Sequence, residues 1–207
     1  MTTAVKICGI TRIEDALFAA QSGVHALGFV FYAKSARNIE PARAAEIIRA
    51  LPPLVTAVGL FVNAEATDIE RVLEQVPLNL LQFHGEETPQ FCNAFRVPYI
   101  KAVRVREGMD LLQYARRYRI ARGLLLDSFV TGAHGGTGTG FDWNLIPRKL
   151  PLPILLSGGL NSANVGDAIR RVGPWAVDVS SGVEAKPGIK DAQKIAAFFK
   201  GVRDADV

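Results

Sequence analysis

The sequence has few cysteines and histidines. Two cysteines among 207 residues, Cys8 and Cys92, are too few for a disulfide framework. The first ends a short apolar segment and the second falls in an expected outer helix, so we expect no bridge between them. The three histidines His25, His84 and His134 lie far apart without metal-ligand spacing. A metal centre is therefore not expected.

Long apolar runs, Pro/Ser-rich linkers and blocks of one charge are also missing. No apolar run reaches the roughly 18 residues of a transmembrane helix, and an apolar strand follows Met1 almost directly. We therefore expect neither a membrane span nor a secretory leader, and a cytoplasmic location. One domain over residues 1–207 is expected. A monomer is the expected state, with a dimer as the alternative, because no exposed apolar seam stands out.

The basic residues are scattered, although the formal net charge is +4. The densest basic run, residues 116–122, fits the end of a helix, where cations complement the helix dipole. The sequence has no basic stripe with interleaved aromatics and no known nucleic-acid module. We expect no nucleic-acid partner, and a mild positive balance suits a small anionic substrate.

Short β-rich runs alternate with helical patterns along the whole chain. Strands are expected near 4–8, 26–31, 55–62, 79–84, 98–103, 122–127, 153–157 and 174–180, and helices near 12–22, 41–51, 65–76, 88–95, 109–118, 143–150, 161–172 and 190–201. Regular alternation indicates a parallel sheet, because consecutive parallel strands need crossover helices. Eight such units predict an α/β fold, a single (β/α)8 TIM barrel, with an open doubly wound sheet as the alternative.

Polar side chains recur on one face of the expected strands. Lys6 and Cys8 alternate with apolar residues in the first strand, as Asp178 and Ser180 do in the last. Because apolar faces belong under the helices, we expect these polar residues to point into the barrel. The same rule turns Asp127 of the sixth strand inward. Since the first and last strands of a closed barrel are neighbours, Lys6 and Asp178 are expected to pair.

Two Gly/Ser turns follow the seventh and eighth strands. Gly158 and Gly159 lie in the first turn, and Ser180, Ser181 and Gly182 in the second. Glycine lets the backbone approach an anion closely, and N–H groups at a helix start attract one. Barrels often bind phosphate with the loops after these two strands. A phosphate site is predicted here, with ordinary turn chemistry as the alternative.

A third glycine-rich segment, residues 135–140, follows the sixth strand. It lacks the Lys-Ser/Thr that ends a Walker loop and the βαβ context of a dinucleotide fingerprint. We interpret it as a mobile lid over the substrate, with a flexible connector as the alternative.

A series of short motifs runs in order along nearly the whole chain. They are VKICGIT (5–11), GFVF (28–31), SAR (35–37), VGLFVN (58–63), LQFHG (81–85), LLDS (125–128), GGTG (135–138), FDW (141–143), SGGL (157–160) and DVSSGVE (178–184). Together they resemble the phosphoribosylanthranilate isomerase family of tryptophan biosynthesis, and the first and last are the most specific. Ala36 departs from the proline usual in this family, so the loop before Arg37 is expected to be less rigid.

This resemblance implies an Amadori rearrangement of N-(5-phosphoribosyl)anthranilate to 1-(2-carboxyphenylamino)-1-deoxyribulose 5-phosphate, without metal or cofactor. By analogy, Asp127 is the general acid at the ring oxygen and Cys8 the general base at C2. Arg37 would bind the anthranilate carboxylate through a bidentate fork. Lys6 would supply positive charge near the thiol, and Asp178 would hold Lys6 or contact a sugar hydroxyl. The alternatives are a buried filler for Cys8, a turn residue for Asp127 and a solvated surface residue for Arg37.

Three other functions remain open. The related sugar-phosphate isomerase of histidine biosynthesis typically uses two aspartates, so Cys8 argues against it. Ribulose-phosphate epimerisation is disfavoured because the metal ligands are missing. A phosphate-ligand sensor on a retired barrel is disfavoured because Cys8 and Asp127 are intact.

Overall fold

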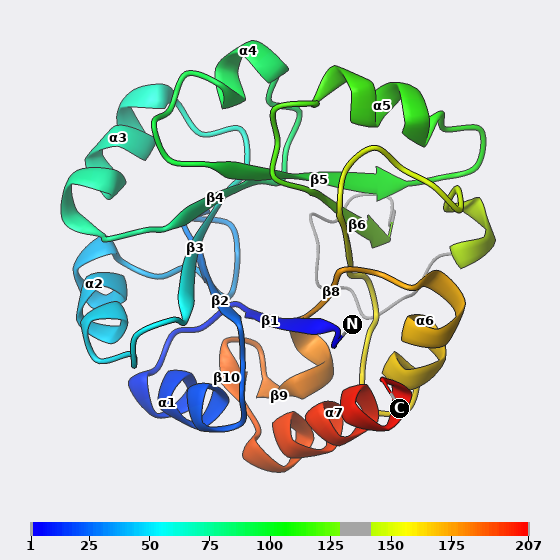
Figure 1. Cartoon of the computed structure of the whole chain (residues 1–207). Helices are drawn as coiled ribbons and strands as arrows, with labels where there is room; N and C mark the ends of the chain where they lie inside the picture. The colour runs from blue at the N-terminus through cyan, green and yellow to red at the C-terminus, as the bar shows by residue number, and fades with distance from the viewer. Residues whose placement is uncertain (1, 129–141, 207) are drawn as a thin grey trace.

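The computed structural model describes residues 2–128 and 142–206. Eight parallel strands close into a barrel in chain order, with β8 hydrogen-bonded to β1 (Figure 1). The strands are β1 Ala4–Cys8, β2 Ala26–Val30, β3 Thr56–Phe61, β4 Leu80–Phe83, β5 Tyr99–Val105, β6 Leu124–Ser128, β7 Ile154–Leu156 and β8 Ala176–Val179. The predicted TIM barrel is confirmed, and the open sheet is wrong because β1 and β8 pair.

Helices surround the barrel on its outside (Figure 1). They are α1 Ile13–Gln21, α2 Pro41–Arg49, α3 Ala66–Gln75, α4 Pro89–Cys92, α5 Leu111–Arg117, α6 Val165–Val172 and α7 Ala192–Ala205. Pro41 starts α2, where its missing N–H leaves no bond unmade. Gly173 ends α6 in a left-handed conformation. Asp191 caps α7 by accepting from the backbone N–H groups of residues 193 and 194.

The helix predicted over residues 143–150 is wrong. This segment contains a single 3-10 turn, η1, at Trp143–Leu145. Ile146 is already extended, because Pro147 disfavours the helical conformation in the residue before it. Pro147 also lacks the N–H that a continuing helix would need. The backbone restrictions that Pro147 imposes therefore outweigh the helical periodicity of the segment.

A small hairpin after β8 was not predicted. The 3-10 turn η2, Ser181–Val183, leads into β9, Glu184–Lys186, which pairs antiparallel with β10, Ile189–Lys190. Helix α7 begins directly afterwards at Ala192, so the expected helix at 190–201 starts later and ends later. The hairpin lies close to the carboxyl end of the barrel strands, because Lys190 contacts the backbone of Cys8 and Ser180.

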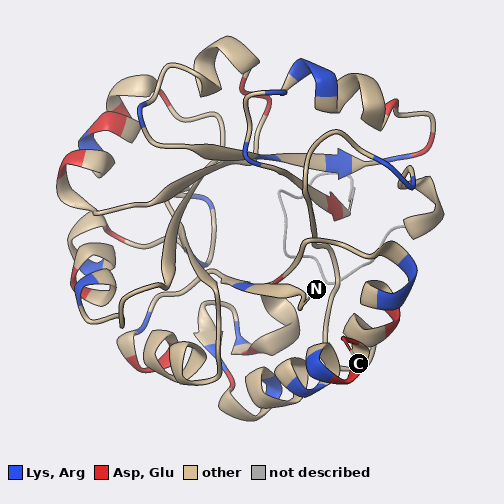
Figure 2. Ribbon diagram, viewed as in Figure 1, with Lys and Arg blue, Asp and Glu red and all other residues tan. Residues whose placement is uncertain are grey.

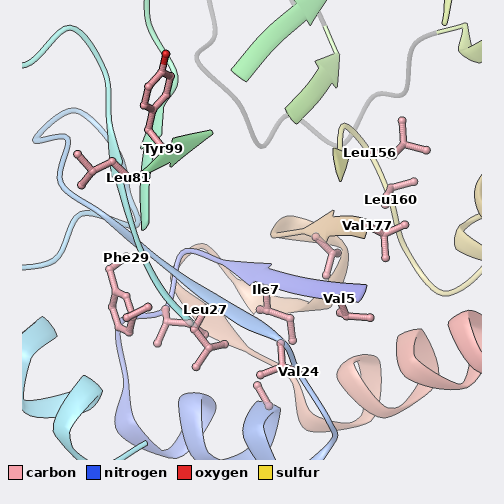
Figure 3. Close-up of a cluster of buried hydrophobic side chains, with 14 of the residues drawn as sticks. Val5, Ile7, Val24, Leu27, Phe29, Leu81, Tyr99, Leu156, Leu160 and Val177 are labelled. Atoms are coloured by element: carbon pink, nitrogen blue, oxygen red, sulfur yellow. The ribbon is translucent and has the colours of Figure 1, made fainter. Parts of the chain in front are cut away.

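Apolar side chains on the outer strand faces form the main core. Val5, Ile7, Leu27 and Phe29 point from β1 and β2 toward the surrounding helices (Figure 3). Each such fully buried side chain contributes about 1.5–3 kcal/mol of transfer free energy. A separate apolar cluster of Ile100, Ala102 and Leu125 fills part of the barrel interior. The polar interior is therefore confined to other levels of the barrel.

Charged residues are spread over the outer helices and loops on all sides of the barrel (Figure 2). This agrees with the scattered charge of the sequence. In the part of the chain that the structure describes, no helix combines the length and hydrophobicity needed to cross a membrane.

Candidate active site

A cavity at the carboxyl ends of the strands brings together Cys8, Asp127 and Arg37, with Asp178 and Ser180 beside them. Its lining comprises Cys8, Val30, Tyr32, Ser35, Arg37, Leu60, Val62, Gln82, His84, Asp127, Ser157, Asp178 and Ser180. The inward orientation predicted for Cys8, Asp127, Asp178 and Ser180 is therefore confirmed. Residues far apart in sequence meet here because parallel strands bring their carboxyl ends to one face of a barrel.

Lys6 and Asp178 form a buried ion pair beneath this cavity. They are direct partners in the β1–β8 register, and Lys6 Nζ lies 2.7 Å from Asp178 Oδ1. Burial alone would lower the pKa of Lys6, but the charges of Asp178 and Cys8 outweigh it and raise that pKa. Ser157 Oγ donates to the other Asp178 oxygen at 3.3 Å. The predicted pairing is confirmed.

Cys8 is a buried thiol at the end of β1. Gly28 on the adjacent strand makes room for it, since a Cβ at Gly28 would lie 2.7 Å from Cys8 Sγ. Burial raises the pKa of Cys8, and Asp178 adds to this, whereas Lys6 and Lys190 act in the opposite direction. The net shift is upward, so the neutral thiol predominates in the unliganded site at neutral pH.

Asp127 is held by two contacts at the end of β6. Its Oδ1 accepts from the backbone N–H of Ser128 at 2.9 Å, and its Oδ2 lies 3.1 Å from His84 Nε2. The other ring nitrogen of His84 lies 2.9 Å from Gln82 Nε2. With the Gln82 amide donating to Nδ1, Nε2 carries the ring proton and donates it to Asp127. The sequence analysis did not identify this contact between His84 and Asp127.

Arg37 reaches the cavity from the loop after β2. Its stem crosses Gly9, which has φ +80°, and a Cβ there would lie 2.5 Å from Arg37 Cδ. Glycine is needed at this position both for the left-handed backbone and for the space. The guanidinium forms a two-point ion pair with Glu184, through distances of 2.8 and 2.7 Å.

The two predicted phosphate turns lie against their neighbours. Gly158 and Gly159 have φ of +86° and +68°, conformations that favour glycine. A Cβ on Gly182 would lie 1.9 Å from the backbone oxygen of Leu160, so the turns after β7 and β8 are in contact. Ser180 Oγ donates to the carbonyl of Cys8 at 3.0 Å, which joins the second turn to β1.

The remaining residues are the other two histidines, the glycine-rich segment and any group that could hold a metal ion. His25 accepts from the backbone N–H of Val5 at 3.1 Å, at the start of β1 rather than at its carboxyl end. The proposed lid at 135–140 and His134 lie outside the described residues. Among the described residues, no group of three or more His, Cys, Asp and Glu side chains is arranged to hold a metal ion.

Glu184 and Lys190 were missed by sequence reasoning. Glu184 is the last residue of the DVSSGVE motif, so a signal for it was present. Lys190 was expected at the start of a helix, and nothing in its local sequence points inward. Both side chains are buried beside Arg37 and Cys8 in the structure.

Comparisons with known proteins identify the family of this chain. Residues 5–201 match the family model of N-(5'-phosphoribosyl)anthranilate (PRA) isomerase. The chain is 61% identical to the N-(5'-phosphoribosyl)anthranilate isomerase of Nitrosospira multiformis, covering 98% of this chain and 97% of that protein.

Solved structures show the same similarity. Phosphoribosyl anthranilate isomerase from Thermotoga maritima is 48% identical with a TM-score of 0.89, covering 98% of this chain and 99% of that one. Another structure of the Thermotoga isomerase concerns monomers generated from a dimeric protein. A phosphoribosyl anthranilate isomerase bound to reduced 1-(o-carboxyphenylamino)-1-deoxyribulose 5-phosphate is 47% identical with a TM-score of 0.86, with coverage of 98% and 99%. The chain belongs to the N-(5'-phosphoribosyl)anthranilate isomerase family of tryptophan biosynthesis, a family of aldose–ketose isomerases.

Proposed function

We propose that this chain converts N-(5-phosphoribosyl)anthranilate to 1-(2-carboxyphenylamino)-1-deoxyribulose 5-phosphate, with Asp127 as general acid and Cys8 as general base. The observation that carries the proposal is the presence of both side chains in one cavity with Arg37. They come from different strands, so they can act on opposite sides of one substrate.

The reaction begins with two proton transfers. Asp127 gives a proton to the ring oxygen as the bond from that oxygen to C1 breaks, and the anthranilate nitrogen supplies the electrons for a C1=N iminium. Cys8, as thiolate, then takes the proton on C2, and the C–H electron pair forms a C1=C2 bond while the π pair of the C1=N bond returns to the nitrogen. The resulting enolamine tautomerises to the ketone. His84 Nε2 would donate a hydrogen bond to the carboxylate left after the first transfer.

The lining of the cavity, together with the two Gly/Ser turns after β7 and β8, suits the three parts of this substrate. Cys8, Val30, Leu60 and Val62 form a buried apolar cluster with Tyr32 beside it, which fits the aromatic ring. Arg37 is assigned to the ring carboxylate, since a guanidinium matches a carboxylate fork. The turns containing Gly158, Gly159, Ser180, Ser181 and Gly182 are assigned to the phosphate.

A turnover assay tests the proposal. Phosphoribosylanthranilate is supplied to the purified chain, and the fluorescence of the anthranilate-type substrate is followed. We expect its loss, with formation of the ketose product, in the absence of added metal or redox cofactor. No acceleration over the uncatalysed reaction would reject the function.

Oligomeric state and location remain predictions. We expect a monomer in the cytoplasm, with a small phosphorylated sugar as partner and no nucleic acid. The dimeric Thermotoga relative makes a dimer the alternative. Light scattering coupled to size-exclusion chromatography decides between the two states.

Replacing Gly182 by alanine is predicted to weaken phosphate recognition. The new Cβ would meet the backbone oxygen of Leu160, so the turn must shift away from its neighbour. A displacement of about 1 Å can cost roughly 100-fold in activity, so we expect KM to rise roughly 10- to 100-fold. Gly166→Ala is the matched control, because its Cβ would meet the end of the flexible Arg170 side chain. Equal KM values in both variants would contradict a role for the Gly182 turn.

A further inference from the structure

Glu184 accepts hydrogen bonds from three residues: Arg37 of the loop after β2, and Gly188 and Lys190 of the hairpin that begins at Glu184. Its Oε1 accepts from Arg37 Nε at 2.8 Å, from Lys190 Nζ at 2.8 Å and from the Gly188 N–H at 3.2 Å. Its Oε2 accepts from Arg37 Nη2 at 2.7 Å. The side chain is only 4% exposed. A buried carboxylate with this many partners holds a fixed orientation and in turn fixes its partners.

The contact with Glu184 occupies one particular edge of Arg37. A guanidinium carries five N–H donors in a rigid plane, which form two forks. Glu184 occupies the side fork, made by Nε and Nη2. The end fork, made by Nη1 and the second N–H of Nη2, points away from Glu184 by the geometry of the group. Arg37 also lines the cavity that contains Cys8 and Asp127, so this fork is placed to meet a ligand there.

Lys190 connects Glu184 to the carboxyl ends of β1 and β8. Its Nζ donates to Cys8 O at 2.6 Å, to Ser180 O at 3.3 Å and to Glu184 Oε1. These three acceptors match the three donors of an ammonium group. The ends of β1 and β8 are therefore tied to Glu184, and Glu184 to Arg37. Arg37 and Lys190 also hold the pKa of Glu184 below its ordinary value, against the effect of burial.

We propose that Glu184 is a positioning residue that holds the Arg37 guanidinium with its end fork toward the carboxylate of the substrate, and so sets the preference for a carboxylated aromatic ring. The inference rests on the proposed function, because it assigns Arg37 to that carboxylate. Without Glu184 the guanidinium would keep its charge but lose its fixed plane. A bidentate contact depends on that plane, whereas charge attraction alone does not.

Two binding probes test this role. One is reduced 1-(o-carboxyphenylamino)-1-deoxyribulose 5-phosphate, and the other is the same compound without the ring carboxyl group. We expect the wild-type chain to bind the carboxylated probe more tightly than the other. Glu184→Gln should reduce the ratio of the two affinities roughly tenfold or more, because the charged fork between Glu184 and Arg37 is lost and the guanidinium no longer holds its plane. Affinity for the probe without the carboxyl group should stay unchanged. KM should rise with kcat nearly preserved.

Arg37→Ala is the reference variant for a double-mutant cycle that combines changes at Glu184 and Arg37. The double variant Glu184→Gln/Arg37→Ala should show no smaller preference than Arg37→Ala alone, since Glu184 acts through Arg37. Glu46→Gln is the matched control, because Glu46 pairs with Arg43 on the exposed surface of α2. If Glu184→Gln fails to fold, Arg37→Lys replaces it, since an ammonium keeps the charge but cannot form two forks. Arg37→Lys should lose the preference too.

The outcomes separate the two proposals. Equal loss of affinity for both probes, additive effects in the double variant, or full preference in Glu184→Gln or Arg37→Lys would overturn the positioning role while the function stands. A wild-type chain that binds neither probe would overturn the proposed function and this inference together.

Discussion

Replacing Asp127 by asparagine is expected to lower kcat by about 10²–10⁴-fold, the usual contribution of a positioned general acid. Asparagine keeps the size of the side chain and an oxygen that can accept from His84. It has no proton of suitable acidity to give to the ring oxygen as the sugar opens. The measurement is steady-state turnover of phosphoribosylanthranilate, with substrate affinity followed through the reduced product analogue.

Asp68→Asn is the matched control for this prediction. Asp68 pairs with Arg71 on the exposed face of α3, so the same chemical change there should leave turnover unaltered. Circular dichroism and thermal unfolding show whether both variants fold. Near-normal turnover in a folded Asp127→Asn variant would show that another group protonates the ring oxygen.

Replacing Cys8 by serine is expected to lower kcat by about 10²–10⁴-fold as well. The serine hydroxyl fits the space that Gly28 leaves for the sulfur, but it is a far weaker acid and does not form an anion at accessible pH. Removal of the C2 proton should therefore become rate-limiting. Cys92→Ser is the control, because Cys92 lies buried in α4 on the outside of the barrel. Only the Cys8 variant should lose activity.

The pH dependence gives an independent check on Cys8. Burial raises its pKa above the ordinary value of 9.0, so the protonated thiol is favoured and the thiolate fraction increases with pH. The rate at which a small alkylating reagent modifies Cys8, followed by mass spectrometry of position 8, should therefore rise from neutral pH toward pH 9 and beyond. Cys8→Ser should show no modification at this position, since serine does not titrate in that range. A rate that does not change with pH over this range would contradict the raised pKa of Cys8.

Local patterns determined most of the fold. The alternation of β-rich and helical segments predicted all eight barrel strands, and side-chain parity turned Lys6, Cys8, Asp127 and Asp178 inward. These patterns succeed because a strand presents successive side chains to opposite faces, and one face must meet the helices. The segment at 143–150 failed because its helical periodicity competes with Pro147, whose effect on the preceding residue is stronger.

Hydrogen-bond partners were much less accessible to sequence reasoning. The pairing of Lys6 with Asp178 could be derived, because a closed barrel makes their strands neighbours. The contact between His84 and Asp127 joins β4 to β6, which are not neighbours, so it depends on side chains meeting across the barrel interior. The distance between such residues is set by barrel diameter and strand stagger, which no local pattern encodes.

The amino-acid order by itself therefore determined the barrel, its inward residues and the family to which the chain belongs. Only the tertiary structure decided which inward groups touch: Arg37 with Glu184, Lys190 with the Cys8 carbonyl, and His84 with Asp127. The physical reason is the range of the interactions. Propensity and periodicity act between residues a few positions apart, whereas these three contacts join residues separated by 147, 182 and 43 positions.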